Sequence, residues 1–184
     1  MPDAERPMRA DARRNYERIV ATARELFTTH GADVPLDDIA KKAGVGAGTL
    51  YRHFPTREKL FEAVYREEIT VLADRAIVLH GELPPWDALE TWLGEQVTWV
   101  VERYKLAMLL KESIDSGSET FQYCQKRLRE AVGVLVEGAA GLIRPDISAP
   151  DVLRLGHGAG MAVRNCSPAE GKLVLTVILD GLRA

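Results

Sequence analysis

Cysteine is scarce in this chain of 184 residues, which contains only Cys124 and Cys166. Two thiols so far apart lack the spacing of a zinc site and form no disulfide framework, which favours a reducing compartment. Long apolar runs are missing too: no stretch of about 18 apolar residues occurs, so no transmembrane helix is expected. Residues 1–15 are polar and charged, so we expect no secretory signal and a cytoplasmic location.

The sequence features of an active site are also lacking. The four histidines are scattered, and no Ser-His-Asp set, paired carboxylates or metal-ligand spacing stands out. The segment 156–160, GHGAG, resembles a nucleotide-binding loop, but such a loop follows a strand. Here it follows Val152, Leu153 and Leu155 at helical spacing, so close packing of two helices is the simpler explanation. We therefore expect no enzyme, no cofactor and no metal.

The chain has a formal net charge of −3, which by itself argues against nucleic acid. The charge is unevenly distributed, because residues 1–66 carry 12 basic and 10 acidic side chains and residues 67–184 carry 12 and 17. The basic side chains include an arginine cluster that precedes the first predicted helix core. Such a cluster is either a solvated tail or, beside a DNA-reading element, an arm on the phosphates. Its members are Arg6, Arg9, Arg13 and Arg14.

Apolar residues recur with helical spacing along the chain, as in Ile19, Ala23, Leu26 and Phe27. No convincing strand, repeat or low-complexity tract is present, so we expect an all-α fold of about nine helices. Late in the chain, Ser148 and Ser167 each precede an acidic residue by three positions, which predicts capped helix starts. The expected helices are one ended by Gly31, one closed by Gly44, one that carries Leu50 and Phe54, and the segments 57–79, 86–103, 106–111, 119–141, 149–164 and 168–183.

The segment GVGAGTLYRHF, which starts at Gly44, predicts a helix-turn-helix. Gly44 can adopt the left-handed conformation that ends a short helix, and Val45 fills the turn. Leu50 and Phe54, four residues apart, face the core. The opposite face of the second helix carries small residues at its start, which allow its backbone to approach the floor of a DNA groove.

This part of the chain resembles the tetracycline-repressor (TetR) family of bacterial regulators. The resemblance covers about residues 12–66 without a gap, and rests on DIAKKAGVGAGTLYRHFPTREKLFEAV. It implies that Tyr51 contacts the DNA backbone and base edges, that His53 braces the motif or meets phosphate, and that Arg57 holds phosphate. The base-facing positions would be Gly46, Ala47, Gly48, Thr49 and Arg52.

One departure from the family pattern concerns the start of the second helix. The family often has a serine or threonine there, whereas this chain has the segment 33–36, Asp-Val-Pro-Leu, without a hydroxyl. Part of the affinity for DNA would then come from elsewhere, and the arginine cluster with Arg13 and Arg14 is the candidate.

The helix after Pro84 and Pro85 has an unusually wide apolar surface. Trp92 and Trp99 share one face, and other apolar residues cover the adjacent face. Such a helix either packs on two sides or lines a cavity, and periodicity leaves both possibilities open. The resemblance implies a pocket for a small apolar or aromatic effector. Its expected lining is Trp92, Gln96, Trp99, Tyr104, Met108 and Phe121.

A single head reads too few base pairs for genomic specificity, so we expect a homodimer on a palindromic operator. The last two helices are the candidate interface, because the first is thinned by glycine and the second has an apolar stripe. The expected interface residues are Leu153, Gly156, His157, Gly160, Val174, Val177 and Ile178.

The sequence thus predicts a DNA-binding transcriptional regulator, a repressor that a small-molecule effector releases from its operator. Residues 1–56 would form a three-helix helix-turn-helix DNA-binding domain. A fourth helix would join it to an effector-binding and dimerisation domain, residues 57–184. The alternative is a helical small-molecule-binding or scaffold protein whose head no longer binds DNA.

Overall fold

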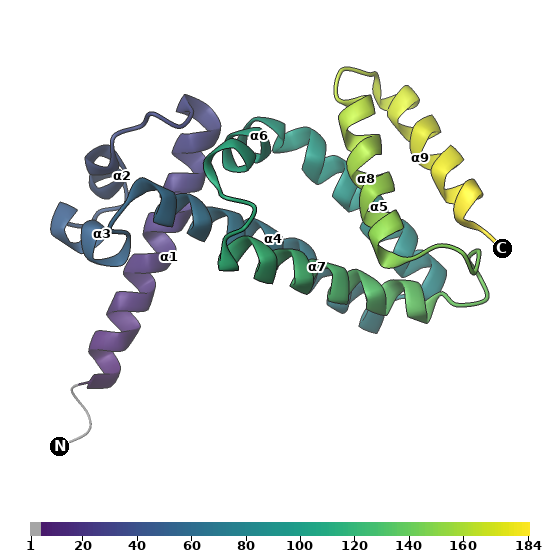
Figure 1. Cartoon of the computed structure of the whole chain (residues 1–184), viewed down its shortest axis with the longest axis horizontal. Coiled ribbons are helices and arrows are strands. Elements are labelled where there is room, and N and C mark those ends of the chain that lie inside the picture. Colours follow the sequence, from purple (N-terminus) through teal and green to yellow (C-terminus); the bar gives the residue numbers. More distant parts are fainter. Residues whose placement is uncertain (1–4) are drawn as a thin grey trace. The chain divides into compact units, whose positions relative to one another are not determined.

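The computed structural model describes residues 5–184, and for residues 5–9 and 111 only the backbone is described. The described residues form nine helices and no strand apart from two isolated bridges (Figure 1). The prediction of an all-α fold with about nine helices is confirmed. The helices are α1 (Glu5–His30), α2 (Leu36–Lys42), α3 (Ala47–His53), α4 (Arg57–Glu82), α5 (Pro85–Glu102), α6 (Tyr104–Ser113), α7 (Glu119–Gly138), α8 (Ala149–Val163) and α9 (Pro168–Leu182).

Packing divides the chain into two compact units. The first contains the residues up to Glu67 together with Lys105–Phe121. The second contains Glu68–Tyr104 and Gln122–Ala184, so α4 and α7 each contribute residues to both units. The functional boundary after residue 56 concerns DNA binding and stays a prediction.

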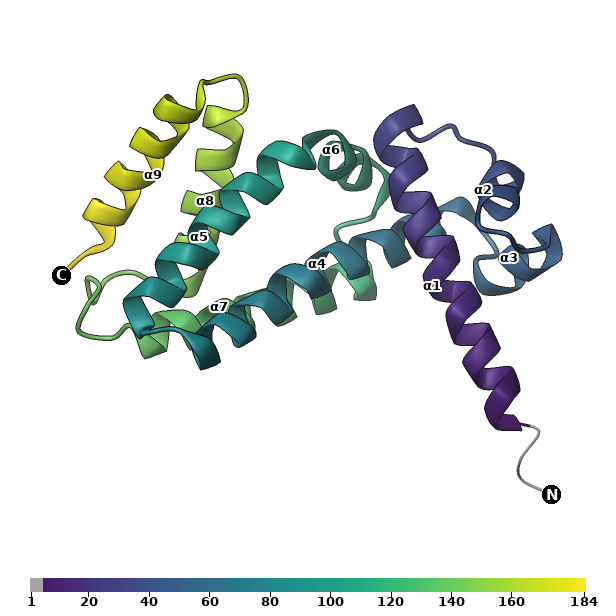
Figure 2. The same cartoon turned by 180° about the vertical axis from the view of Figure 1, so that it is seen from behind.

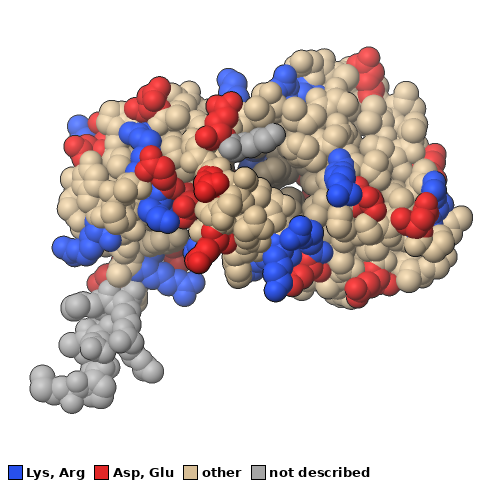
Figure 3. Space-filling model, viewed as in Figure 1, with Lys and Arg blue, Asp and Glu red and all other residues tan. Residues whose placement is uncertain are grey.

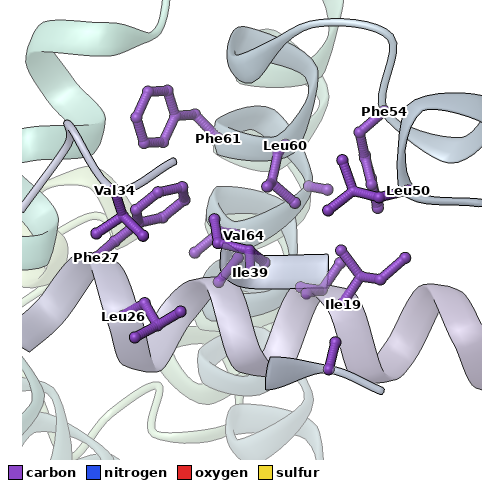
Figure 4. Close-up of a cluster of buried hydrophobic side chains, with 14 of the residues drawn as sticks. Ile19, Leu26, Phe27, Val34, Ile39, Leu50, Phe54, Leu60, Phe61 and Val64 are labelled. Atoms are coloured by element: carbon purple, nitrogen blue, oxygen red, sulfur yellow. The ribbon is translucent and has the colours of Figure 1, made fainter. Parts of the chain in front are cut away.

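One apolar core holds the first unit together (Figure 4). Phe27 of α1 packs against Phe61 of α4, with ring centroids 4.6 Å apart. Leu106 and Leu110 of α6 join this core although they come much later in the sequence. Each such side chain stabilises the fold by roughly 1.5–3 kcal/mol when it is removed from water. The labelled members in Figure 4 are Ile19, Leu26, Phe27, Val34, Ile39, Leu50, Phe54, Leu60, Phe61 and Val64.

Helix α1 starts earlier than the sequence analysis expected. Arg13 and Arg14 lie on it rather than in a tail that precedes it, which corrects that expectation. The segment is rich in alanine, arginine and glutamate, which favour helix, and Arg13 pairs with Glu17 one turn later. The side chains of Arg6 and Arg9 lie outside the described residues.

In the second unit, α5 and α8 lie side by side, as both views show (Figures 1 and 2). Gly156 and Gly160 face α5. A Cβ atom on Gly156 would lie 1.9 Å from Oε1 of Gln96, and one on Gly160 would lie 2.5 Å from Cβ of Val100. Both positions therefore require glycine, and the prediction that GHGAG serves close helix packing is confirmed. The neighbouring helix belongs to the same chain.

Capping boxes start α8 and α9, as the sequence predicts. The backbone N–H of Ser167 donates to Oε2 of Glu170 at 2.7 Å, and the N–H of Glu170 donates to Oγ of Ser167 at 3.4 Å. Hydrogen bonds from the hydroxyl and the backbone N–H of Ser167 lower the pKa of Glu170. At α8 the backbone N–H of Ser148 donates to Oδ2 of Asp151 at 3.0 Å, and the hydroxyl and backbone N–H of Ser148 lower the pKa of Asp151.

Candidate nucleic-acid interface

The first unit contains a helix-turn-helix formed by α2 and α3. Gly44 has a φ of 66°, in the left-handed region that favours glycine, and it turns the chain between the two helices. The turn is closed by the N–H of Val45, which donates to the carbonyl oxygen of Ala40 at 3.0 Å. Leu50 and Phe54 are buried beneath α3. The face of α3 opposite the core is therefore fixed with respect to α1 and α2.

That outer face contains most of the residues predicted to read DNA. Gly46, Ala47, Gly48 and Arg52 are exposed, Thr49 is half-buried, and Tyr51 is 45% exposed. A Cβ atom on Gly46 or Gly48 would meet nothing within 4 Å. Neither glycine has a positive φ. Gly46 is the N-cap of α3, where glycine is favoured over alanine, whereas at Gly48 packing and backbone conformation within the chain give no reason for glycine.

His53, at the end of α3, braces this helix against α1. Its ring lies 6.1 Å from that of Tyr16 in an edge-to-face arrangement, and Tyr16 also packs on Phe54 at 5.1 Å. Burial raises the pKa of Tyr16, an effect that Arg66 opposes and Glu67 reinforces. The Tyr16 hydroxyl therefore stays protonated at neutral pH. This role of Tyr16 could not be predicted, because a tyrosine on an amphipathic helix gives no signal of a distant histidine.

Arg57, at the start of α4, binds the segment that connects α1 with α2. Its Nη1 donates to the carbonyl oxygen of Val34 at 2.7 Å and also to that of Ala32. Helix α2 begins after Pro35 without a side-chain cap, as the missing hydroxyl implied. Arg57 thus has a structural role that sequence analysis did not foresee. Its predicted contact with phosphate stays a prediction.

Several cations of the first unit are paired with acidic side chains of the same unit. Arg13 lies 2.8 Å from Glu17, Arg14 pairs with Asp11, and Lys42 lies 2.7 Å from Glu25. On the face seen in Figure 3, basic and acidic side chains are interspersed. Any attraction of DNA by this unit therefore comes from local placement of cations rather than from a large positive excess.

The residues predicted to line an effector pocket occupy different environments. Trp92 is fully buried and its indole N–H donates to the carbonyl oxygen of Leu72 at 3.1 Å. The amide of Gln96 donates to the carbonyl oxygen of Leu153 at 3.2 Å, and its Oε1 is buried without a hydrogen-bond partner among the described residues. Both side chains therefore belong to the packing of α5.

The remaining predicted pocket residues are less buried. Trp99 is half-buried and belongs to the second unit, as does Tyr104, whose ring lies 3.6 Å from the guanidinium of Arg164. Met108 and Phe121 belong to the first unit. A cavity of about 520 Å³ between α4, α5 and α9 is lined by Trp99 and by none of the other predicted pocket residues.

The residues predicted for a dimer interface fall into two groups. Gly156 and Gly160 are buried against α5, so the reason for placing them at a partner chain was wrong. Val174 and Ile178 are half-buried because they pack within the chain against the cluster of Val97, Ala159 and Val163. Of the other three, His157 is exposed, Val177 is 62% exposed and Leu153 is half-buried. Leu173, beside that stripe, is 64% exposed.

The described part of the chain contains no group of three or more histidine, cysteine or acidic side chains that could hold a metal ion. None of its helices is both long enough and apolar enough to span a lipid bilayer.

Comparison with known proteins agrees with this architecture. Residues 19–64 match the family described as bacterial regulatory proteins, tetR family, and residues 84–184 match the C-terminal domain described as transcriptional regulator SbtR-like. The TetR transcriptional regulator SCO0520 from Streptomyces coelicolor is 36% identical, with a TM-score of 0.71 over 91% of this chain and 98% of its own. The TetR transcription regulatory protein from Mycobacterium vanbaalenii is 32% identical, with a TM-score of 0.76 over 97% and 100%.

A curated relative matches only the N-terminal part. An HTH-type transcriptional regulator of Staphylococcus aureus is 38% identical over 65 residues, so the chain matches 35% of that relative's length. The C-terminal match and the two regulators above 30% identity cover far more of the chain. The chain belongs to the TetR family of DNA-binding, helix-turn-helix transcriptional regulators, which is a family without enzymatic activity.

Proposed function

We propose that this regulator is a repressor that inserts the start of α3 into the major groove of a palindromic operator. The observation that carries the proposal is the open space around Gly48, which lies inside the first turn of α3. Glycine costs about 1 kcal/mol in a helix relative to alanine, and nothing inside the chain accounts for it at this position. A DNA surface that closely approaches the backbone would account for it.

The residues on and beside α3 would contact different parts of the DNA. Tyr51 and Arg52 project from α3 and would contact base edges and backbone, together with Ala47 and Thr49. His53 would hold α3 in place through Tyr16. The phosphate contacts would come from the remaining N–H groups of Arg57 and from Arg13 and Arg14.

Two copies of the chain would provide the two heads that a palindrome requires. The exposed apolar side chains Leu173 and Val177 of α9, with His157 and Met161 of α8, form the surface proposed for this contact. A homodimer that covers this surface would set the spacing of the two α3 helices at about one turn of DNA or a multiple of it.

A small apolar or aromatic effector would weaken operator binding by favouring an arrangement in which the two heads do not fit adjacent major grooves. Helix α4 belongs to both units and is the natural connection. A structure of FadR from Bacillus subtilis, which shares the fold at 18% identity and a TM-score of 0.69, is a complex with stearoyl-CoA. As a DNA-binding regulator, the protein would act in the cytoplasm.

A second candidate function is a helical small-molecule-binding or scaffold protein whose head no longer binds DNA. The pairing of Arg13, Arg14 and Lys42 with acidic neighbours favours it, because paired cations attract phosphate weakly.

Selection of bound sequences from a random DNA pool tests the two functions. We expect an enriched two-fold symmetric site whose affinity falls steeply with salt concentration, because phosphate contacts release counterions. A half-site of the enriched sequence serves as the control and should bind much more weakly. A pool without enrichment, together with no salt-dependent binding, would instead support the scaffold function.

A further inference from the structure

The cavity of the second unit differs from the pocket that the sequence predicted. It has a volume of about 520 Å³ and opens to solvent between α4, α5 and α9. Its apolar walls come from Val71 and Leu72, from the ring of Trp99, and from Leu175. Small-molecule sites typically have volumes of about 300–1,000 Å³, apolar walls and few polar groups, so this cavity has a suitable size and lining.

The orientation of the Trp99 ring in this cavity is fixed. Its indole N–H donates to Oε2 of Glu68 at 3.1 Å. Glu68 is only 3% exposed, and the same carboxylate oxygen lies 2.8 Å from Nε of Arg103. Arg103 also lies over this ring, with its guanidinium carbon 6.0 Å from the ring centroid. Because the tryptophan is held in place by these contacts, a flat ligand can pack on it at a low cost in side-chain entropy.

A glycine in the lining leaves room for such a ligand. Gly94 of α5 lines the cavity, and a Cβ atom there would already lie 3.5 Å from Cδ2 of Leu175. Any larger side chain at this position would extend into the space between α5 and α9. The absence of a side chain at Gly94 thus contributes directly to the cavity.

The charges around the cavity indicate which ligands it can accept. Arg75 binds Glu95 through two nitrogen atoms, each at 2.8 Å, and Arg103 lies between Glu68 and Glu102. The lining therefore carries two guanidinium groups and two carboxylates, and Arg103 is also paired with the buried Glu68. A negatively charged ligand would find no excess positive charge here.

We propose that this cavity binds a flat aromatic molecule of about two or three rings that carries no negative charge, stacked on Trp99. The proposal deepens the effector part of the proposed function, and its consequence for transcription rests on that function. Binding of the ligand itself does not depend on DNA.

The test uses two related dyes whose emission rises in apolar surroundings, neutral N-phenylnaphthylamine and its anionic relative anilinonaphthalene sulfonate. We expect the neutral dye to bind the full chain at least about tenfold more tightly than the anionic one. Val71→Trp should fill the cavity and weaken binding of the neutral dye about tenfold or more. Val78→Trp is the matched control. Val78 and Val71 lie on the same helix and are similarly exposed, at 44% and 50%, but only Val71 lines the cavity.

Equal dye affinity in Val71→Trp and Val78→Trp, or no binding of the neutral dye, would overturn the site. Equal affinity for both dyes would overturn the charge preference. If circular dichroism shows that Val71→Trp is unfolded, Thr98→Trp replaces it as the test variant. Thr98 lines the cavity from an exposed position on α5, so this variant must show the same loss of affinity for the neutral dye. DNA binding is measured separately without dye, so its failure would count against the proposed function and leave the dye result intact.

Discussion

The guanidinium of Arg57 donates a hydrogen bond to the backbone carbonyl oxygen of Val34, with Nη1 and the oxygen 2.7 Å apart. The two residues join the start of α4 to the segment between α1 and α2. A guanidinium has five N–H donors, so this bond and its companion to Ala32 leave others for phosphate. Substitution of Arg57 therefore changes two separate measurements.

In Arg57→Ala, we expect the free energy of unfolding in urea to fall by about 1–3 kcal/mol, because two backbone carbonyl oxygens lose their charged donor. If Arg57 also contacts phosphate, the slope of log affinity for DNA against log salt should decrease by about one. Lys59→Ala is the control, because its ion pair with Glu62 is exposed on the lysine side and contributes about 0–1 kcal/mol. If Arg57→Ala is as stable as wild type, Arg57 has no structural role of the kind described.

Tyr51→Ala should abolish specific DNA binding and leave stability nearly unchanged, because the side chain is 45% exposed on the outer face of α3. Leu50→Ala, at the neighbouring buried position, should instead destabilise the protein and lower the free energy of unfolding by about 2–5 kcal/mol. Anisotropy of a labelled operator and urea unfolding give the two readouts. Operator binding by Tyr51→Ala within about twofold of wild type would mean that α3 docks in another way.

The three glycines of the segment 156–160 should respond differently to alanine. Gly156→Ala and Gly160→Ala should each destabilise the protein by about 1–3 kcal/mol, because the added methyl group collides with Gln96 or Val100. Gly158→Ala should stabilise it by up to about 1 kcal/mol, because a Cβ atom there meets nothing within 4 Å and alanine favours helix. Thermal unfolding followed by circular dichroism measures all three. A stabilising Gly160→Ala would show that α5 and α8 are farther apart than in the structure.

Val177→Glu tests the proposed dimer. Val177 is 62% exposed on α9, so the variant should fold, and a buried carboxylate at the contact should convert a dimer into a monomer with far weaker operator binding. Sedimentation gives the mass. Val78→Glu, at a comparably exposed valine of α4, should remain dimeric. A Val177→Glu dimer with normal operator affinity would place the two-fold axis on other helices.

The cap of α9 predicts how stability depends on pH. Hydrogen bonds from Ser167 lower the pKa of Glu170 from its ordinary value of 4.5. Because the folded state binds this proton less readily than the unfolded state, the stabilisation is present above pH 4.5 and is lost as pH falls through the lowered pKa. The stability difference between wild type and Glu170→Gln should therefore shrink below about pH 4.5. Glu130→Gln, at an exposed position on α7, is the control.

Local signals explain why so much of the fold could be predicted. Gly31 and Gly44, which both have positive φ, and the serine caps at 148 and 167 act within a few residues, so sequence identifies the helix ends. The helix-turn-helix could be predicted equally well, because the spacing of Leu50 and Phe54 places both on one buried face. Such features depend on the nearest neighbours in the chain.

Contacts between distant segments could not be predicted in the same way. Sequence reasoning assigned the bare face of Gly156 and Gly160 to a partner chain, because spacing reveals a gap on a helix but not which helix fills it. Trp92 had the features of a pocket residue, yet its indole N–H bonds the backbone of α4 in the core. The bond from Arg57 to Val34 spans a turn whose path depends on the whole first unit.

The contact between α5 and α8 has a mechanical consequence. Gln96 and Val100, one helical turn apart, fill the gaps at Gly156 and Gly160 with less clearance than a methyl group requires. Any slide or roll of α8 along α5 would bring a neighbouring Cβ atom into a space already occupied, so shear between the two helices is steeply resisted. The two helices therefore move as one rigid unit. A displacement of α5 beside Trp99 must also displace α8 and its exposed His157.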